Sequence, residues 1–128
     1  MFHTLDNIRI PVECCPTSNV MTLELAKHFE GDLVHGLRRH PRLKDWIDSE
    51  YPISINTDDP GIFNTNSTNE LVLLAEAFEI KEPNIIKNII EQSVEQIFES
   101  EEVKESLREL IKQRMQLLLD QYHDTLVN

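Results

Sequence analysis

Two short runs of apolar, partly β-branched residues flank one helical segment, and this order constrains the fold more than any other feature of the chain. The first run covers residues 9–15 and leads into a polar stretch, 16–19. The second covers 53–56 and stops at Thr57-Asp58-Asp59-Pro60-Gly61, a dense turn signal. Strand, helix, strand is the unit that builds parallel sheets. We therefore predict an α/β protein with two parallel strands, near 9–15 and 53–56, and a polar loop at 16–19.

The segment between the two predicted strands has helical spacing. His40-Pro41 opens it, since proline suits a first helical turn, where its missing N–H costs nothing. Leu43, Trp46 and Ile47 then form one apolar face. Tyr51-Pro52 ends this predicted helix.

The second half of the chain is predicted to be helical. Ser67 and Glu70 are spaced as a capping box ahead of an apolar run, and two amphipathic helices follow, so the closing helices cover 67–122. Two strands alone cannot bury both of their faces, whereas a parallel sheet normally has several strands and is covered on both sides. The chain is therefore either a mostly helical protein with a small ribbon or the end of a larger barrel.

The composition argues against some classes of partner. The chain of 128 residues has a formal net charge of −11, and phosphate backbones require clustered Lys and Arg, so we expect no nucleic-acid surface. No apolar run approaches the ~20 residues that span a bilayer, and no secretory signal is visible. Cys14 and Cys15 are adjacent, so a disulfide between them would be strained. We expect reduced thiols in a cytoplasmic protein without membrane partners.

The acidic pair Asp58-Asp59 is the main candidate for chemistry. Both carboxylates come just after a predicted strand and just before a proline, and neighbouring side chains point in different directions. One of them can bind a metal cation, since carboxylate oxygen is a Zn²⁺ ligand, while the other accepts a hydrogen bond from a ligand. In (β/α) barrels, the C-terminal ends of the strands carry the catalytic groups. On pattern alone, a plain surface turn explains the same residues.

The stretch Ser54-Ile55-Asn56-Thr57-Asp58-Asp59-Pro60, with Gly61-Ile62-Phe63 after it, resembles the signature at the last barrel strand of the adenosine/AMP deaminase family. Three further pieces resemble the family in the right order: residues 13–19, His40-Pro41, and residues 69–78 with Gln92-Ser93-Val94. They resemble the preceding strand and its loop, the start of the intervening helix, and the closing helices. The likeness is strongest to the adenosine deaminase-like branch, which acts on N6-methyl-AMP.

The resemblance implies that residues 1–128 are the C-terminal segment of one TIM-like (β/α)8 barrel that binds one zinc ion. The implied reaction is hydrolytic removal of the C6 amino group of adenosine, AMP or N6-methyl-AMP. Zinc would lower the pKa of a bound water so that hydroxide attacks the ring carbon. Asp58 is implied as a zinc ligand, and Asp59 as a hydrogen-bond partner of the five-membered side of the purine. Ser18 and Asn19 are expected to hydrogen-bond the loop at the barrel mouth.

The other residues that the family requires are expected upstream of this chain, in the remainder of the barrel. They are a His-x-His pair, a third histidine ligand, a glutamate proton donor and a histidine near the water. The chain has no His-x-His; its histidines are His3, His28, His35, His40 and His123. We interpret His28 and His35 as solvated and His3 as part of a helix end. One carboxylate cannot hold tetrahedral zinc alone, so we assign no catalytic residue within the chain and expect it to be inactive by itself.

A second hypothesis belongs to another class of protein. The chain would be an acidic, non-catalytic helical interaction module, or a degenerate deaminase remnant, in which the helices from Ser67 onward pack as a small bundle. Their apolar stripes would then contact a partner. The same stripes are also those of helices that pack against a barrel.

Overall fold

The computed structural model describes residues 9–127, with side chains through residue 125. It divides into two compact units, one up to Ser93 and one from Val94 onward. None of its helices is long and apolar enough to cross a membrane. The elements in chain order are β1 (Val12–Cys14), α2 (Pro16–Thr22), α3 (Leu33–Arg38), α4 (Leu43–Asp48), β2 (Ile53–Ile55), α5 (Pro60–Phe63), α6 (Ser67–Ala77), α7 (Pro83–Glu95) and α8 (Glu101–Val127).

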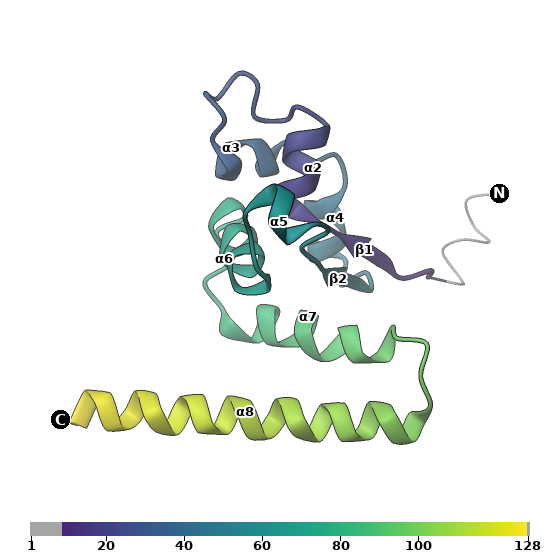
Figure 1. Cartoon of the computed structure of the whole chain (residues 1–128), viewed down its shortest axis with the longest axis vertical. Helices are drawn as coiled ribbons and strands as arrows, with labels where there is room; N and C mark the ends of the chain where they lie inside the picture. The colour runs from purple at the N-terminus through teal and green to yellow at the C-terminus, as the bar shows by residue number, and fades with distance from the viewer. Residues whose placement is uncertain (1–8, 128) are drawn as a thin grey trace. The chain divides into compact units, whose positions relative to one another are not determined.

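The two strands pair in parallel, as the strand–helix–strand order predicts. Val12 lies opposite Ile53, and Cys14 lies opposite Ile55. The pairing extends to both ends: the Val12 N–H donates to the Pro52 carbonyl (3.0 Å), and the Asn56 N–H donates to the Cys14 carbonyl (2.8 Å). Figure 1 shows β1 and β2 side by side. Within the described residues, the chain is therefore mostly helical α/β, and its first unit contains a two-stranded parallel sheet.

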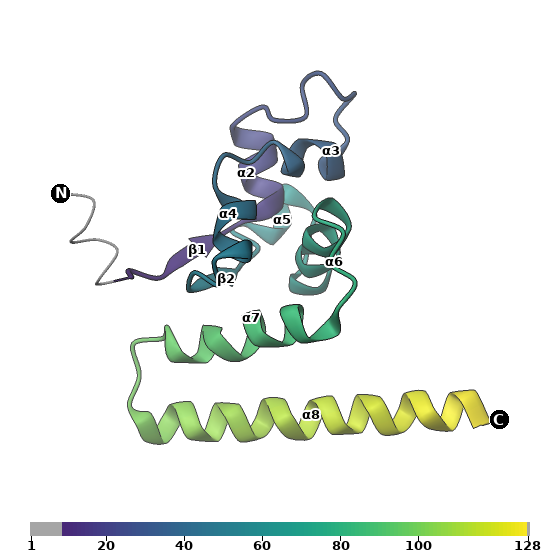
Figure 2. The same cartoon turned by 180° about the vertical axis from the view of Figure 1, so that it is seen from behind.

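The core of the first unit forms where α2, α3, α6 and β2 pack on one another. Figure 2 shows the same unit from behind, with α3 next to α2 and α6. Leu37, Leu43, Ile53 and Leu74 are each no more than 1% exposed. These side chains come from α3, α4, β2 and α6. Burying a large aliphatic side chain stabilises a fold by about 1.5–3 kcal/mol, so this cluster holds the strands and the helices together.

A glycine permits the close approach of α3 to α2 and to the segment that follows α2. A Cβ atom added at Gly36 would lie 2.7 Å from the Val20 Cγ1 atom and 2.9 Å from the Ala26 Cβ atom. Both neighbours are small, buried side chains, so neither has a flexible end that could move aside. The packing of this unit therefore requires a residue without a side chain at Gly36.

Several local predictions are wrong in detail. Residues 16–19 are not a loop, because Pro16 occupies the first turn of α2. The helix predicted from His40-Pro41 begins only at Leu43, and the His40 Nδ1 atom instead accepts the N–H of Leu43 (3.0 Å) ahead of it. The predicted capping box is also absent. Asn66 is the N-cap of α6, and its side chain accepts the Asn69 N–H (2.9 Å).

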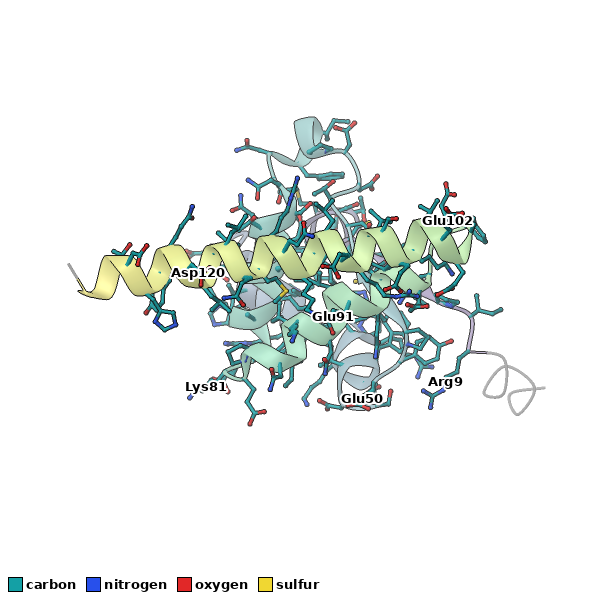
Figure 3. All side chains as sticks on the ribbon, turned by 90° about the horizontal axis from the view of Figure 1, so that it is seen from below. Arg9, Glu50, Lys81, Glu91, Glu102 and Asp120 are labelled. Atoms are coloured by element: carbon teal, nitrogen blue, oxygen red, sulfur yellow. The ribbon has the colours of Figure 1, made fainter. Side chains whose placement is uncertain are left out.

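The second unit contains α8, which is a single long helix. Its first turns are joined by the partly exposed Arg108, which donates to Glu95 (Nε, 2.7 Å), Glu101 (Nη2, 2.9 Å) and Glu105 (Nη1, 2.7 Å). Figure 3 shows charged side chains projecting along this helix, with Glu102 near its start and Asp120 nearer its far end. The three carboxylates raise the pKa of the Arg108 guanidinium.

Candidate functional site

The carboxyl ends of β1 and β2 meet at one edge of the sheet, because the two strands are parallel. After β1 the chain enters α2. After β2 it passes through the acidic pair Asp58-Asp59 and enters α5. The Ser18 hydroxyl donates to the Asp58 Oδ2 atom at 2.8 Å, across a sequence separation of 40 residues. Figure 1 shows α2 and α5 beyond the same end of the strands. Ser18 thus makes the predicted hydrogen bond to the loop after β2, whereas the Asn19 side chain, which was expected to do the same, accepts from the Cys14 Sγ atom (3.6 Å).

Asp58 has a left-handed backbone, with φ +56°. Residues other than glycine rarely adopt this conformation, although aspartate and asparagine tolerate it best. Two contacts hold the residue there: the Ser18 hydroxyl on its carboxylate, and a backbone hydrogen bond to the Cys15 sulfur. A defined outlier that is held by neighbouring groups is the kind of feature that clusters at functional sites.

The Asp58 carboxylate is exposed and only partly engaged. Its Oδ2 atom accepts from Ser18, whereas its Oδ1 atom accepts no hydrogen bond within residues 9–127. An ionised carboxylate has about four lone-pair positions, so Asp58 retains most of its capacity to accept a donor or a cation. Carboxylates that bind metals are commonly oriented by such a neighbouring hydrogen bond. The residue therefore fits one position of a metal site.

Asp59 has a different environment. Its Oδ1 atom accepts the Ile62 N–H at 3.0 Å and so caps the short helix α5, whose first residue is Pro60. This contact is the local turn role that the sequence pattern also allowed. The Oδ2 atom has no hydrogen bond within the described residues, and the side chain is exposed. Asp59 therefore stabilises the turn and keeps one oxygen for another partner.

Both cysteines are free thiols, as predicted. Burial, together with the smaller effects of the neighbouring Cys15 and Glu70, raises the pKa of Cys14 to about 12. The pKa of Cys15 is also raised, first by burial and then by the charge of Asp58, against the lowering effect of the Asp58 backbone hydrogen bond. Only the thiolate is a strong nucleophile and metal ligand. At neutral pH both thiols are protonated and serve the packing at the strand edge.

Glu70 is a residue of this region that the sequence did not indicate. It is fully buried, and its Oε2 atom accepts the Thr17 N–H at 3.0 Å, across 53 residues. Its Oε1 atom is buried without a hydrogen-bond partner among the described residues. The capping-box spacing assigned Glu70 to the start of its own helix. No local pattern reveals a contact that bridges α6 and the first turn of α2.

The histidines do not add to this site within the described part of the chain. His28 and His35 are exposed, as expected, and the His35 Nδ1 atom lies 3.1 Å from the Asp32 carboxylate. His40 caps α4, and burial lowers its pKa. His3 lies outside the described residues. Between residues 9 and 127, no three His, Cys, Asp or Glu side chains are grouped so that they could hold a metal ion.

Comparison with known proteins connects this arrangement to a family. The sequence pattern described as adenosine deaminase matches residues 1–114. The chain belongs to the adenosine deaminase family. The adenosine deaminase-like protein of Drosophila pseudoobscura pseudoobscura is 32% identical over 90 residues, which are 70% of this chain and 24% of that protein. The aminodeoxyfutalosine deaminase of Streptomyces coelicolor is 35% identical over 86 residues, covering 65% of this chain and 20% of that protein.

A solved structure gives the same result. The crystal structure of the Arabidopsis N6-mAMP deaminase superposes with a TM-score of 0.71 at 26% identity, and the match covers 88% of this chain and 30% of that one. The chain thus spans about a quarter of the curated relative from Drosophila and less than a third of the solved structure. The sequence-based assignment to the family is confirmed, as is its relation to adenosine deaminase-like and N6-mAMP deaminases.

Proposed function

We propose that this chain supplies the closing part of a zinc-dependent purine deaminase. Residues 1–128 would be the C-terminal segment of one (β/α)8 barrel domain, and the rest of the barrel would complete both the sheet and the site. The substrate class would be a purine nucleoside or nucleotide that carries an amino group at C6: adenosine, AMP or N6-methyl-AMP. The protein would act in the cytoplasm. Membership of the family and the position of the acidic pair at the carboxyl edge of a parallel sheet support this proposal.

In this proposal, Asp58 holds the zinc ion with one carboxylate oxygen. The observation that carries the assignment is its half-engaged, exposed carboxylate, oriented by Ser18 on one oxygen and without a partner on the other. The bound metal would lower the pKa of a coordinated water to near neutrality. This chain alone would bind zinc weakly, because its described residues do not provide three grouped ligands.

Asp59 would bind the substrate through the oxygen that does not cap α5. Its Oδ1 atom is fixed by the Ile62 N–H, so the orientation of the whole carboxylate is set before a ligand arrives. A carboxyl group that is preorganised in this way makes a hydrogen bond to the five-membered ring of a purine with little loss of side-chain entropy. The acid and base groups of the reaction would come from the remainder of the barrel.

The test is zinc analysis and a C6-deaminase assay of the complete barrel, expressed as this chain joined to its in-frame upstream coding sequence. Asp58→Asn should remove bound zinc and activity, because the neutral amide is a far poorer zinc ligand. Asp59→Asn should retain zinc while raising KM. One zinc per chain and normal turnover in the Asp58 variant would rule the proposal out. The chain of 128 residues on its own should show neither stoichiometric zinc nor turnover.

The alternative, a helical interaction module or a deaminase remnant, is favoured by one observation. The family match ends at residue 114, and the exposed apolar residues that follow on α8 include Leu117, Leu118, Leu119 and Tyr122. If no coding sequence with a His-x-His pair precedes the chain, and the chain elutes as a defined complex with itself or another protein, this reading replaces the deaminase proposal.

A further inference from the structure

Glu70 has an environment that stability alone does not explain. Its side chain is fully buried in the core between α6 and α2, and one of its two carboxylate oxygens has no hydrogen-bond partner there. Removing a carboxylate from water is costly, and a hydrophobic side chain of similar size at such a position is often as stable or more so. A polar group in this position therefore calls for a role that a hydrophobic residue could not perform.

The side-chain hydrogen bond between Glu70 and Thr17 supplies a cap that the N-cap residue of α2 does not. The N-cap residue Cys15 makes no side-chain cap, and Pro16 has no N–H. Thr17 is therefore the first residue of this helix that has an N–H to be satisfied, and the Glu70 Oε2 atom accepts it at 3.0 Å. Negative charge at the start of a helix is also favourable toward the helix dipole. A side chain from 53 residues away thus fixes the first turn of α2.

The next residue along α2 is the one that touches the acidic pair. Ser18 is only 5% exposed, and its hydroxyl donates to the Asp58 Oδ2 atom at 2.8 Å. Because Thr17 and Ser18 share one peptide bond in the same helical turn, a shift of the Thr17 amide also displaces the Ser18 hydroxyl. The contacts form a continuous path from Glu70 through Thr17 and Ser18 to Asp58.

We propose that Glu70 is a positioning residue for Asp58, which acts by anchoring the first turn of α2 so that the Ser18 hydroxyl is held on the Asp58 carboxylate. The consequence for catalysis rests on the proposed function, in which Asp58 binds zinc. The contact path itself does not depend on that function, because it is made by this chain without a metal. Sites of this kind require their ligands to be held within about 0.5 Å, so the anchor would matter for metal geometry.

Two matched substitutions separate hydrogen bonding from packing. Glu70→Gln keeps an oxygen that can accept the Thr17 N–H, whereas Glu70→Met keeps an unbranched side chain of similar length without an acceptor. Ser18→Ala serves as the reference for an Asp58 carboxylate that has lost its partner, and Asp58→Asn identifies the Asp58 signal. The chain is labelled with ¹⁵N and with ¹³C at the aspartate carboxyl carbons, and is studied by NMR without metal.

In Glu70→Met, the Thr17 amide should exchange with solvent about tenfold faster than in the unmodified chain, the effect of losing a hydrogen bond worth roughly 1.4 kcal/mol. The Asp58 carboxyl signal should move most of the way to its position in Ser18→Ala. In Glu70→Gln, both the exchange rate and the signal should stay near those of the unmodified chain. A purely structural role predicts instead that Glu70→Met is as stable or more so, with the Asp58 signal unmoved, and that result would overturn the proposal.

The experiment remains decisive if Glu70→Met does not fold. Glu70→Gln then decides alone: an unmoved Asp58 signal with a protected Thr17 amide supports the proposal, and movement of the signal toward the Ser18→Ala position overturns it. Failure of the positioning role of Glu70 can be distinguished from failure of the proposed function. If the NMR effects occur while Asp58→Asn retains zinc in the complete barrel, Glu70 positions Asp58 but the zinc assignment is wrong.

Discussion

The carboxylates of this chain are held in two contrasting ways. At the carboxyl edge of the sheet, Asp58 and Glu70 are each held by a single neutral donor, across 40 and 53 residues of sequence. On α8 and just before it, three glutamates share one arginine, Arg108, with sequence separations of 3 to 13 residues. The hydrogen bond at Asp58 is partly buried and the one at Glu70 is fully buried, whereas the bonds to Arg108 are exposed to solvent.

The contrast shows which contacts can specify a site. Exposed ion pairs contribute little to stability because water and salt screen them. A buried hydrogen bond between a neutral donor and a carboxylate is screened much less, and the loss of one partner leaves the other unsatisfied. The strand edge should therefore respond to single substitutions more strongly than α8 does. Four measurements test this difference, and the single tryptophan of the chain, Trp46, reports on the first unit.

The largest effect is expected in the core of the first unit. Leu74→Ala should lower the free energy of unfolding by about 2–5 kcal/mol, because Leu74 is fully buried and its removal leaves a cavity. The control is Leu118→Ala on α8, where the side chain is 65% exposed and the change should stay within about 0.5 kcal/mol. Urea unfolding followed by Trp46 fluorescence measures the first variant, and circular dichroism the second. Equal effects would remove the contrast between the units.

A second effect should depend on pH through Cys14. Its pKa in the folded chain is raised to about 12 from the ordinary 9.0, so above pH 9 the unfolded chain loses a proton that the folded chain keeps. The free energy of unfolding should then fall by about 1.4 kcal/mol per pH unit between these values. Below pH 9 this contribution should be constant.

Cys14→Val preserves a small apolar side chain at this buried strand position and should flatten the alkaline decline. Urea unfolding at about pH 8.5 and about pH 10.5 measures the slope in both proteins. Identical slopes would show that the Cys14 thiol remains accessible to base. The sequence alone placed Cys14 in a strand, and this titration checks how deeply the structure buries its thiol.

A smaller effect is expected from the hydrogen bond at the strand edge. Ser18→Ala should cost about 1 kcal/mol in the free energy of unfolding, since it removes the donor to Asp58 from a nearly buried position. The matched control is Ser106→Ala, because the Ser106 hydroxyl also donates, to the Glu102 carbonyl at 3.2 Å, but on the exposed helix α8. That control should be close to neutral. A larger loss in the control would contradict the account of the two regions.

The smallest effect concerns Arg108. Arg108→Gln should reduce the helicity of α8 slightly at low ionic strength, because Glu95, Glu101 and Glu105 lose their shared partner. At about 1 M NaCl the difference from the unmodified chain should vanish, since the screening length is then about 3 Å. Circular dichroism across a salt series measures this. A difference that persists at high salt would mean that the network is less solvated than its exposure indicates.

The difference between the regions also explains what the sequence predicted. Both strands and the closing helices could be predicted, because the apolar spacing that marks a strand or a helix involves residues that are close in sequence. The helix α2 was missed, since Pro16-Thr17-Ser18-Asn19 reads as a turn and the cap that stabilises it comes from Glu70, far along the chain. The Ser67–Glu70 spacing suggested a capping box, yet Asn66 caps that helix instead. Local patterns do not contain information on which distant carboxylate will reach a backbone N–H.

The candidate site was found in part. From composition and spacing alone, Asp58 and Asp59 could form either a plain surface turn or a ligand-binding site. The family resemblance gave them different roles, Asp58 as a zinc ligand and Asp59 as a partner of the purine. The structure places both at the carboxyl edge of the parallel pair, as predicted, and gives Asp59 a turn contact as well. The metal and substrate roles of these residues stay predictions. The identity of the groups that hold Asp58, Ser18 on its carboxylate and Cys15 on its backbone, required the three-dimensional arrangement.

The left-handed backbone of Asp58 decides how this position must be probed in a mutational scan. Asparagine and glycine accept a φ of +56°, whereas alanine and the β-branched residues do not adopt it readily. Alanine would therefore report two losses at once, the carboxylate and the chain path into α5. Asparagine keeps both the backbone path into α5 and an oxygen that accepts from Ser18, so the effect of Asp58→Asn reports the loss of the negative charge alone. In a scan that scores folding and turnover separately, folding should tolerate Asp, Asn and Gly at this position. Turnover should tolerate aspartate alone.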